Sequence, residues 1–185
     1  MKLKLLILVL ALQAAWLLGM VATQEYALAH GKAILLETQP VDPRDLLSGD
    51  YLMLRYKISE VPANLFSPPV KTDLPAGTKI FVSLTPGTNG FYIVSRASTN
   101  EFAAAANEVL LRGETANRWW NATNSVRVEY GIERYYVAEG MGNPRGNLTA
   151  RVVVPASGRA KLQQVFLGGK PYEQAMKNPH NEPAP

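Results

Sequence analysis

The chain has 185 residues and a net charge of +4, which comes from 19 basic and 15 acidic side chains. It has no cysteine and two histidines, so a disulfide framework, a thiol nucleophile, a zinc–thiolate site and a multi-histidine metal site are all excluded. The basic residues are scattered and form no stripe with aromatic residues, which argues against nucleic-acid binding. No phosphate loop, dinucleotide-binding glycine pattern or calcium loop occurs, so we expect no cofactor and no metal.

The N-terminal segment is apolar enough to cross a membrane. Leu5–Ala22 carries Gln13 as its one polar side chain, and a helix of this length rises ~27 Å, close to a hydrocarbon core of ~30 Å. Lys2 and Lys4 precede it, so the positive-inside rule places residues 1–4 in the cytoplasm and the rest outside. The alternative is a cleaved signal peptide over residues 1–29, since Ala27-Leu28-Ala29 is an A-x-A site.

The first strands are predicted from alternation and turn residues. Lys32–Thr38 reads as a strand that ends at Pro40, and residues 42–49 read as a turn or a single helical turn. Tyr51–Ile58 alternates with period two, so we expect one continuous half-buried strand. Its inward face comprises Leu52, Leu54, Tyr56 and Ile58. The proline-rich segment 61–77 reads as a loop.

Two hairpins and two short strands are predicted farther along the chain. Pro86–Gly90 joins the strands 79–85 and 91–98, and Pro155–Gly158 joins the strands 150–154 and 159–167. The two short strands cover 109–112 and 125–130. The segments with helical character are 101–108 and 133–139.

Many short strands with closely spaced turn signals indicate a mainly β domain, either a small β-sandwich or a partly open barrel, with one N-terminal transmembrane helix. The predicted organisation is a cytoplasmic segment 1–4, an anchor 5–22, a β domain 30–172 and a flexible tail 173–185.

Two polar groups could carry chemistry. The first comprises Asp42, Arg44, Asp45 and Asp50, which could bind a charged ligand or supply an acid–base pair, although caps and turns use the same residue types. The second comprises Glu133, Arg134, Tyr135, Tyr136, Glu139 and Gly140, whose carboxylates could meet Asp50 in space. The simpler interpretation is that the tyrosines pack on the core while Glu133 and Arg134 pair locally.

Several ordered motifs resemble one known family. Residues 49–56 read G-D-Y-L-M-L-R-Y, a full match to the pattern G-D-Y-x-x-L-x-Y. P-V-D-P-R-D at 40–45, Y-G-I-E-R-Y-Y-V-A-E-G at 130–140 and S-G-R-A-K-L at 157–162 are also similar. Over roughly residues 1–170 the chain resembles the GDYxxLxY family of membrane-anchored bacterial proteins, departing from it in a short, glycine-rich stretch at 141–148.

The resemblance implies an N-terminal membrane anchor and a domain outside the cytoplasm of a bacterium, and it implies no known activity. Members of this family often sit beside multi-spanning membrane proteins, so we expect the partner to be another membrane protein or an envelope component, and the anchor to lie in the bacterial inner membrane. We therefore expect an interaction or accessory domain in the periplasm, a single-pass protein with its N-terminus inside. The alternative is a carboxylate-dependent envelope hydrolase that uses Asp42 or Asp50 with Glu133 or Glu139. The candidate binding residues are Asp42, Pro43, Arg44, Asp45, Gly49, Asp50, Tyr51, Leu54, Tyr56, Glu133, Tyr135, Glu139 and Gly140.

Overall fold

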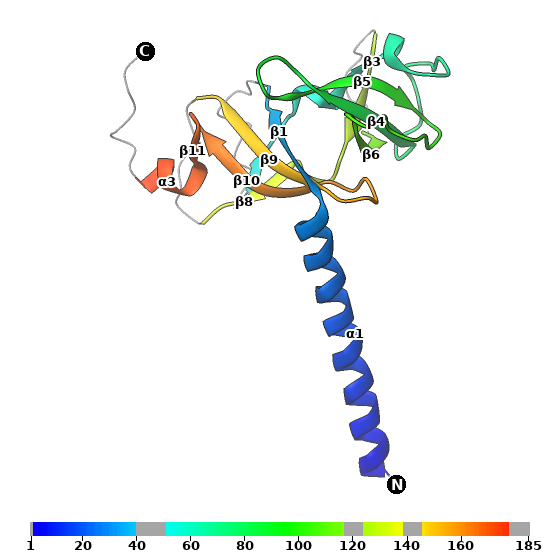
Figure 1. Ribbon diagram of the computed structural model, residues 1–185, viewed down its shortest axis with the longest axis vertical. Coiled ribbons are helices and arrows are strands. Elements are labelled where there is room, and N and C mark those ends of the chain that lie inside the picture. The colour runs from blue at the N-terminus through cyan, green and yellow to red at the C-terminus, as the bar shows by residue number, and fades with distance from the viewer. Residues whose placement is uncertain (1, 40–50, 117–123, 139–145, 178–185) are drawn as a thin grey trace.

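A computed structural model describes residues 2–39, 51–116, 124–138 and 146–177. It consists of a long N-terminal helix, α1 (Lys2–His30), and a β domain from which the helix projects (Figure 1). Every described side chain of α1 is exposed, and the helix is long and apolar enough to cross a membrane. It contains the whole predicted span 5–22 and continues for eight further residues to His30.

Three antiparallel sheets build the β domain. The four-stranded sheet has the order β1-β9-β10-β11, the five-stranded sheet has the order β3-β7-β6-β4-β5, and β2 pairs with β8. Two 3₁₀ turns and a short helix complete the described elements. The elements are β1 (Lys32–Glu37), β2 (Tyr51–Met53), η1 (Lys57–Ser59), β3 (Glu60–Pro62), η2 (Ala63–Leu65), β4 (Lys79–Pro86), β5 (Tyr92–Ser98), β6 (Val109–Thr115), β7 (Ser125–Glu129), β8 (Arg134–Tyr136), β9 (Leu148–Val154), β10 (Lys161–Leu167), β11 (Lys170–Pro171) and α3 (Tyr172–Lys177).

One hydrophobic core joins the three sheets. Ile34 and Val152 come from the four-stranded sheet, Val82 and Leu111 from the five-stranded sheet, and Leu52 from β2, and all five are buried in the same cluster. Within the described residues no sheet closes on itself. The predicted class, a mainly β fold with one apolar N-terminal helix, is therefore confirmed, and the described sheets are open rather than closed into a barrel.

The two predicted hairpins are confirmed. β4 pairs with β5 across the turn that contains Gly87, and β9 pairs with β10 across the turn that contains Gly158. The strand predicted at 125–130 is also present as β7, with Val126 and Val128 buried and Arg127 exposed. Each of these segments carries its own turn or alternation signal, so its structure needs little information from elsewhere in the chain.

The strand predicted over Tyr51–Ile58 is wrong as a continuous element. β2 ends at Met53 because β8 offers it only three partners, and the next amide, that of Leu54, donates to the carbonyl oxygen of Glu133 at 2.7 Å. Tyr56 then bridges to Thr38 beside β1, and the chain turns into η1. The predicted burial nevertheless holds: the four residues expected to face inward, Leu52, Leu54, Tyr56 and Ile58, are at most 3% exposed.

Both predicted helical segments are also wrong. Residues 101–108 form a turn because the Glu108 carboxylate accepts hydrogen bonds from the hydroxyls of Ser83 (2.7 Å) and Ser95 (3.0 Å) and from the Ala105 amide (3.2 Å). The described part of the segment 133–139 contains β8, which the pairing with β2 holds extended. In addition, the predicted loop 61–77 contains η2. Residues 173–177 of the predicted tail belong to the helix α3, and the rest of that tail lies outside the described residues.

Candidate functional site

The two motif segments lie side by side in the fold. In the β2–β8 ribbon Tyr51 pairs with Tyr136 and Leu52 pairs with Tyr135, so the G-D-Y-x-x-L-x-Y segment is a direct neighbour of the segment that follows Tyr130. The predicted meeting of Asp50 with the carboxylates of the second segment stays a prediction, because Asp50 and Glu139 are outside the described part of the chain. Asp42, Pro43, Arg44, Asp45, Gly49, Asp50, Glu139 and Gly140 lie outside the described residues.

Leu54 and Tyr56 of the motif serve the core. Leu54 is 1% exposed, and Tyr56 is fully buried with its hydroxyl donating to the carbonyl oxygen of Ile132 at 2.8 Å. Tyr130 makes the reciprocal link, since its hydroxyl donates to the carbonyl oxygen of Ile58 at 2.8 Å. Burial raises the pKa of both phenols, with a smaller contribution from the nearby Glu133 carboxylate. These tyrosines are therefore neutral structural donors that tie the two motif segments together.

Glu133 has a structural task in the turn before β8. Its carboxylate accepts a hydrogen bond from the Tyr130 amide at 2.6 Å. Burial raises its pKa above the usual range, and hydrogen bonds from the backbone oppose that shift. The other three carboxylates of the hydrolase hypothesis lie outside the described residues, so that hypothesis stays a prediction. Among the described residues, no group of three or more acidic or histidine side chains is placed to hold a metal ion.

The exposed part of the motif region is aromatic. The Tyr51 ring lies 5.9 Å from that of Tyr136, and the Arg134 guanidinium lies over Tyr51 at 5.4 Å. Tyr136 is 71% exposed, whereas Tyr135 is half-buried and packs edge-on against Tyr172 at 5.8 Å. We call Tyr51, Arg134 and Tyr136 the aromatic patch.

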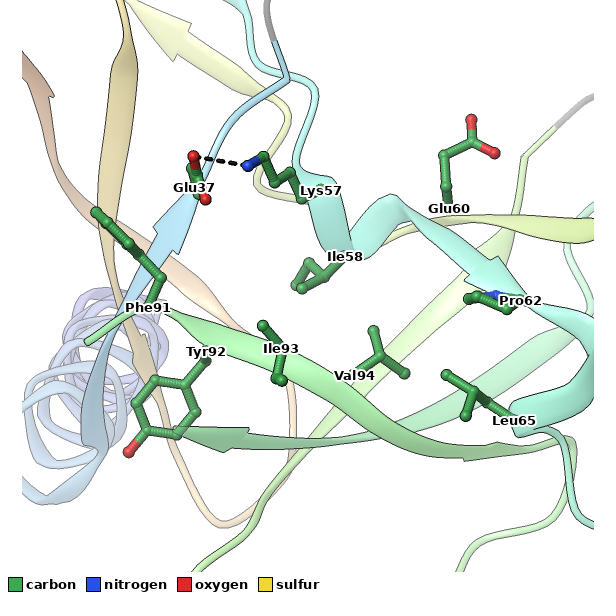
Figure 2. A pocket seen from close by; sticks show the side chains of 10 residues that line it. All are labelled: Glu37, Lys57, Ile58, Glu60, Pro62, Leu65, Phe91, Tyr92, Ile93 and Val94. Carbon is green, nitrogen blue, oxygen red and sulfur yellow. Dashed lines mark ion pairs between the residues drawn. The ribbon is translucent and has the colours of Figure 1, made fainter. Parts of the chain in front are cut away.

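A shallow groove of about 230 Å³ begins where the motif segment ends. Figure 2 shows Ile58 of η1 facing Ile93 and Val94 of β5 across this groove. The Lys57 ammonium pairs with the Glu37 carboxylate at 2.7 Å on the rim, which leaves the lining mostly apolar. The groove residues are Glu37, Lys57, Ile58, Glu60, Pro62, Leu65, Phe91, Tyr92, Ile93 and Val94.

One wall of the groove is an open sheet edge. β5 is the last strand of its sheet, so one of its edges has no neighbouring strand in that sheet. On this edge, the described backbone hydrogen bond is near the C-terminal end of β5, where the Ser67 amide donates to the Ala97 carbonyl oxygen at 2.9 Å. Ile93 is 54% exposed, and outside α1 only Ile93 and Tyr136 are exposed large hydrophobic residues in the described part of the chain. An apolar groove beside an open strand edge can accept an extended segment of another protein.

Sequence reasoning missed the groove because its walls come from three separate segments. The motif alternation did identify Ile58 as an inward-facing residue. Ile93 lies in a strand that was predicted correctly, but nothing in its sequence indicated that its exposed face borders a groove. The motif thus acts indirectly: buried Leu54 and Tyr56 fix the course of the chain into η1, and η1 forms one wall of the groove.

Comparison with known proteins identifies a family that the chain matches over most of its length. The family model described as "GDYXXLXY protein" matches residues 13–165, which is most of the chain. No curated protein and no solved structure matches.

Proposed function

Because the chain belongs to the GDYxxLxY family, we propose that it is a single-pass protein of the bacterial inner membrane whose β domain, outside the cytoplasm, binds another membrane protein. The observation that carries the proposal is that every described side chain of α1 is exposed, although the helix adjoins a β domain with its own hydrophobic core. A helix that is apolar all round and packs on nothing within the protein is suited to a lipid environment.

The charges flanking α1 support the proposed orientation. Lys2 and Lys4 lie at its N-terminal end, and Glu25 is the next charged residue along the helix. Because basic residues flanking a membrane span are usually retained on the cytoplasmic side, this charge pattern supports a β domain outside the cytoplasm.

The groove is the proposed contact surface. It combines the open edge of β5, the exposed Ile93 and a mostly apolar lining. Glu37 and Lys57 neutralise each other there, and the third charged residue, Glu60, accepts a hydrogen bond from the Ser125 hydroxyl at 2.9 Å. An extended segment of the partner would add to β5 through backbone hydrogen bonds and place alternate side chains on Ile58 and Val94. The aromatic patch is the competing surface, since Tyr136 is 71% exposed and Ile93 is 54% exposed.

Site-specific photo-cross-linking in intact membranes tests the proposal. A photoreactive side chain replaces Ile93, Tyr136 or, as a matched control on the outer face of β9, the exposed Arg151. We expect one defined membrane protein to be cross-linked from position 93 and not from position 151, and Ile93→Asp to abolish its co-purification in mild detergent. Cross-linking from position 136 alone would move the contact to the aromatic patch, and a chain that yields no membrane partner from either position would contradict the interaction role.

A further inference from the structure

The end of the four-stranded sheet from which α1 leaves is basic. One residue, Gly31, separates α1 from β1, and Lys32 opens β1 opposite Val154 at the end of β9. Lys161 pairs with Val153 on the other side of β9, so it lies at the same end of the sheet. Arg159 precedes it in the β9–β10 turn and is exposed. Figure 1 shows this turn beside the end of α1.

The local charge at this end is unbalanced. Residues 148–167 contain no acidic side chain, and neither do residues 31–36. Within the described chain, Lys32, Arg159 and Lys161 form no ion pair, and the Lys32 ammonium lies over the Tyr92 ring at 5.8 Å. The neighbouring Arg112, whose amide donates to the Gly158 carbonyl oxygen, is already neutralised by Glu101 at 3.1 Å. Glu25, on α1, is the nearest acidic residue along the chain before this end.

The length of α1 sets the distance of these residues from the bilayer. Residues 5–22 fill a hydrocarbon core of ~30 Å, and the eight residues that remain in α1 rise about 12 Å. The headgroup layer accounts for about 5–8 Å of that rise on each side, and the usual tilt of about 20° shortens the remainder. With the proposed anchoring, Lys32 would lie within about one Debye length, ~8 Å, of the headgroups, and Lys161 lies at the same end of the sheet as Lys32.

We propose that Lys32, Arg159 and Lys161 bind the headgroups of anionic phospholipids and so hold the β domain against the membrane in one orientation. The inference rests on the proposed membrane anchoring. Each basic residue near an anionic surface favours the bound orientation by about fivefold, so removal of two of them weakens it by about 25-fold.

The absence of native cysteine makes a direct test possible. A fluorophore is attached to Ser157→Cys in the exposed β9–β10 turn of the full chain, which is reconstituted into nanodiscs of phosphatidylcholine alone or with phosphatidylglycerol, each containing a headgroup-linked quencher. We expect stronger quenching with phosphatidylglycerol, and 0.5 M salt should suppress the difference. Arg159→Gln/Lys161→Gln should abolish the difference, whereas Arg151→Gln/Lys170→Gln, which removes the same charge elsewhere on the sheet, should preserve it.

Two results would overturn the inference. Equal quenching of the unmodified chain in the two lipids would show that the basic end does not bind anionic headgroups, and an equal loss in both double variants would assign the effect to total charge. Incorporation into nanodiscs is measured separately by co-elution with the discs. A chain that incorporates but responds to neither lipid contradicts this inference alone, whereas a chain that does not incorporate contradicts the membrane anchoring as well.

Discussion

The apolar side chains of α1 and those of the β domain share their chemistry but have opposite surroundings. Leu10 and Leu12 are more than half exposed, whereas Leu84 and Leu111 are completely buried. In the β domain the protein supplies its own apolar environment, with a core that joins three sheets. In α1 no part of the described protein does so, and in the proposed anchoring the lipid bilayer would supply that environment. Buried leucines thus mark the folded core of the β domain, whereas the exposed leucines of α1 mark the proposed membrane span.

The same substitution in the two regions should have opposite consequences, and this is the largest effect that we expect. Leu111→Asp places an unpaired charge in the core and should unfold the β domain, seen as lost protease resistance. Leu10→Asp/Leu12→Asp adds about 6–8 kcal/mol to the cost of membrane insertion, so the chain should leave the carbonate-resistant membrane fraction. The β domain should remain resistant to protease. If the α1 variant also lost that resistance, the two regions would not be independent.

The motif tyrosines sharpen the comparison within the β domain. Tyr56→Phe leaves the carbonyl oxygen of Ile132 without its buried donor and should cost roughly 1–3 kcal/mol of unfolding free energy. Tyr136→Phe, on an exposed ring, should change stability by less than about 0.5 kcal/mol. Thermal unfolding followed by near-ultraviolet circular dichroism measures both. Equal stability of the two variants would show that the buried hydroxyl does not hold the motif segments together.

Glu133 should make a smaller contribution that depends on pH. Burial raises its pKa in the folded chain, so the folded state holds the proton more tightly than the unfolded state. The stability of the folded state is then complete below pH ~4.5 and falls as the pH rises through the raised value. Glu133→Gln removes this dependence, so the variant should gain stability relative to the unmodified chain between pH 4 and pH 8. A difference that is the same at both pH values would contradict the predicted titration.

Local signals explain which parts of the fold could be predicted from the sequence. The β4–β5 and β9–β10 hairpins carry their own turn residues, and alternation correctly assigned Leu54 and Tyr56 to the core. The extent of the motif strand could not be predicted, because it depends on a β8 partner about 80 residues away. The turn at 101–108 likewise depends on Ser83 and Ser95, whose hydroxyls reach Glu108 from two other strands.

The candidate site was less accessible to sequence reasoning for the same reason. The pattern of tyrosines marks the motif but not its role, because a buried hydroxyl donor and an exposed ligand-binding phenol use the same residue. Tyr56 is a buried hydroxyl donor, whereas Tyr136 is exposed. What distinguishes these two tyrosines is the set of residues that surrounds each of them in the fold, which the sequence pattern does not show. Ile93, the most exposed large apolar residue of the groove, becomes part of a groove because η1, which is distant in the sequence, faces it in the fold.

The single residue between α1 and β1 has a mechanical consequence. With only Gly31 between α1 and β1, the β domain has almost no tether and stays close to the end of the helix. If α1 spans the bilayer as proposed, a partner that binds the groove must therefore itself lie near the membrane surface. A flexible insertion at Gly31 would lengthen the tether and admit partners farther from the membrane.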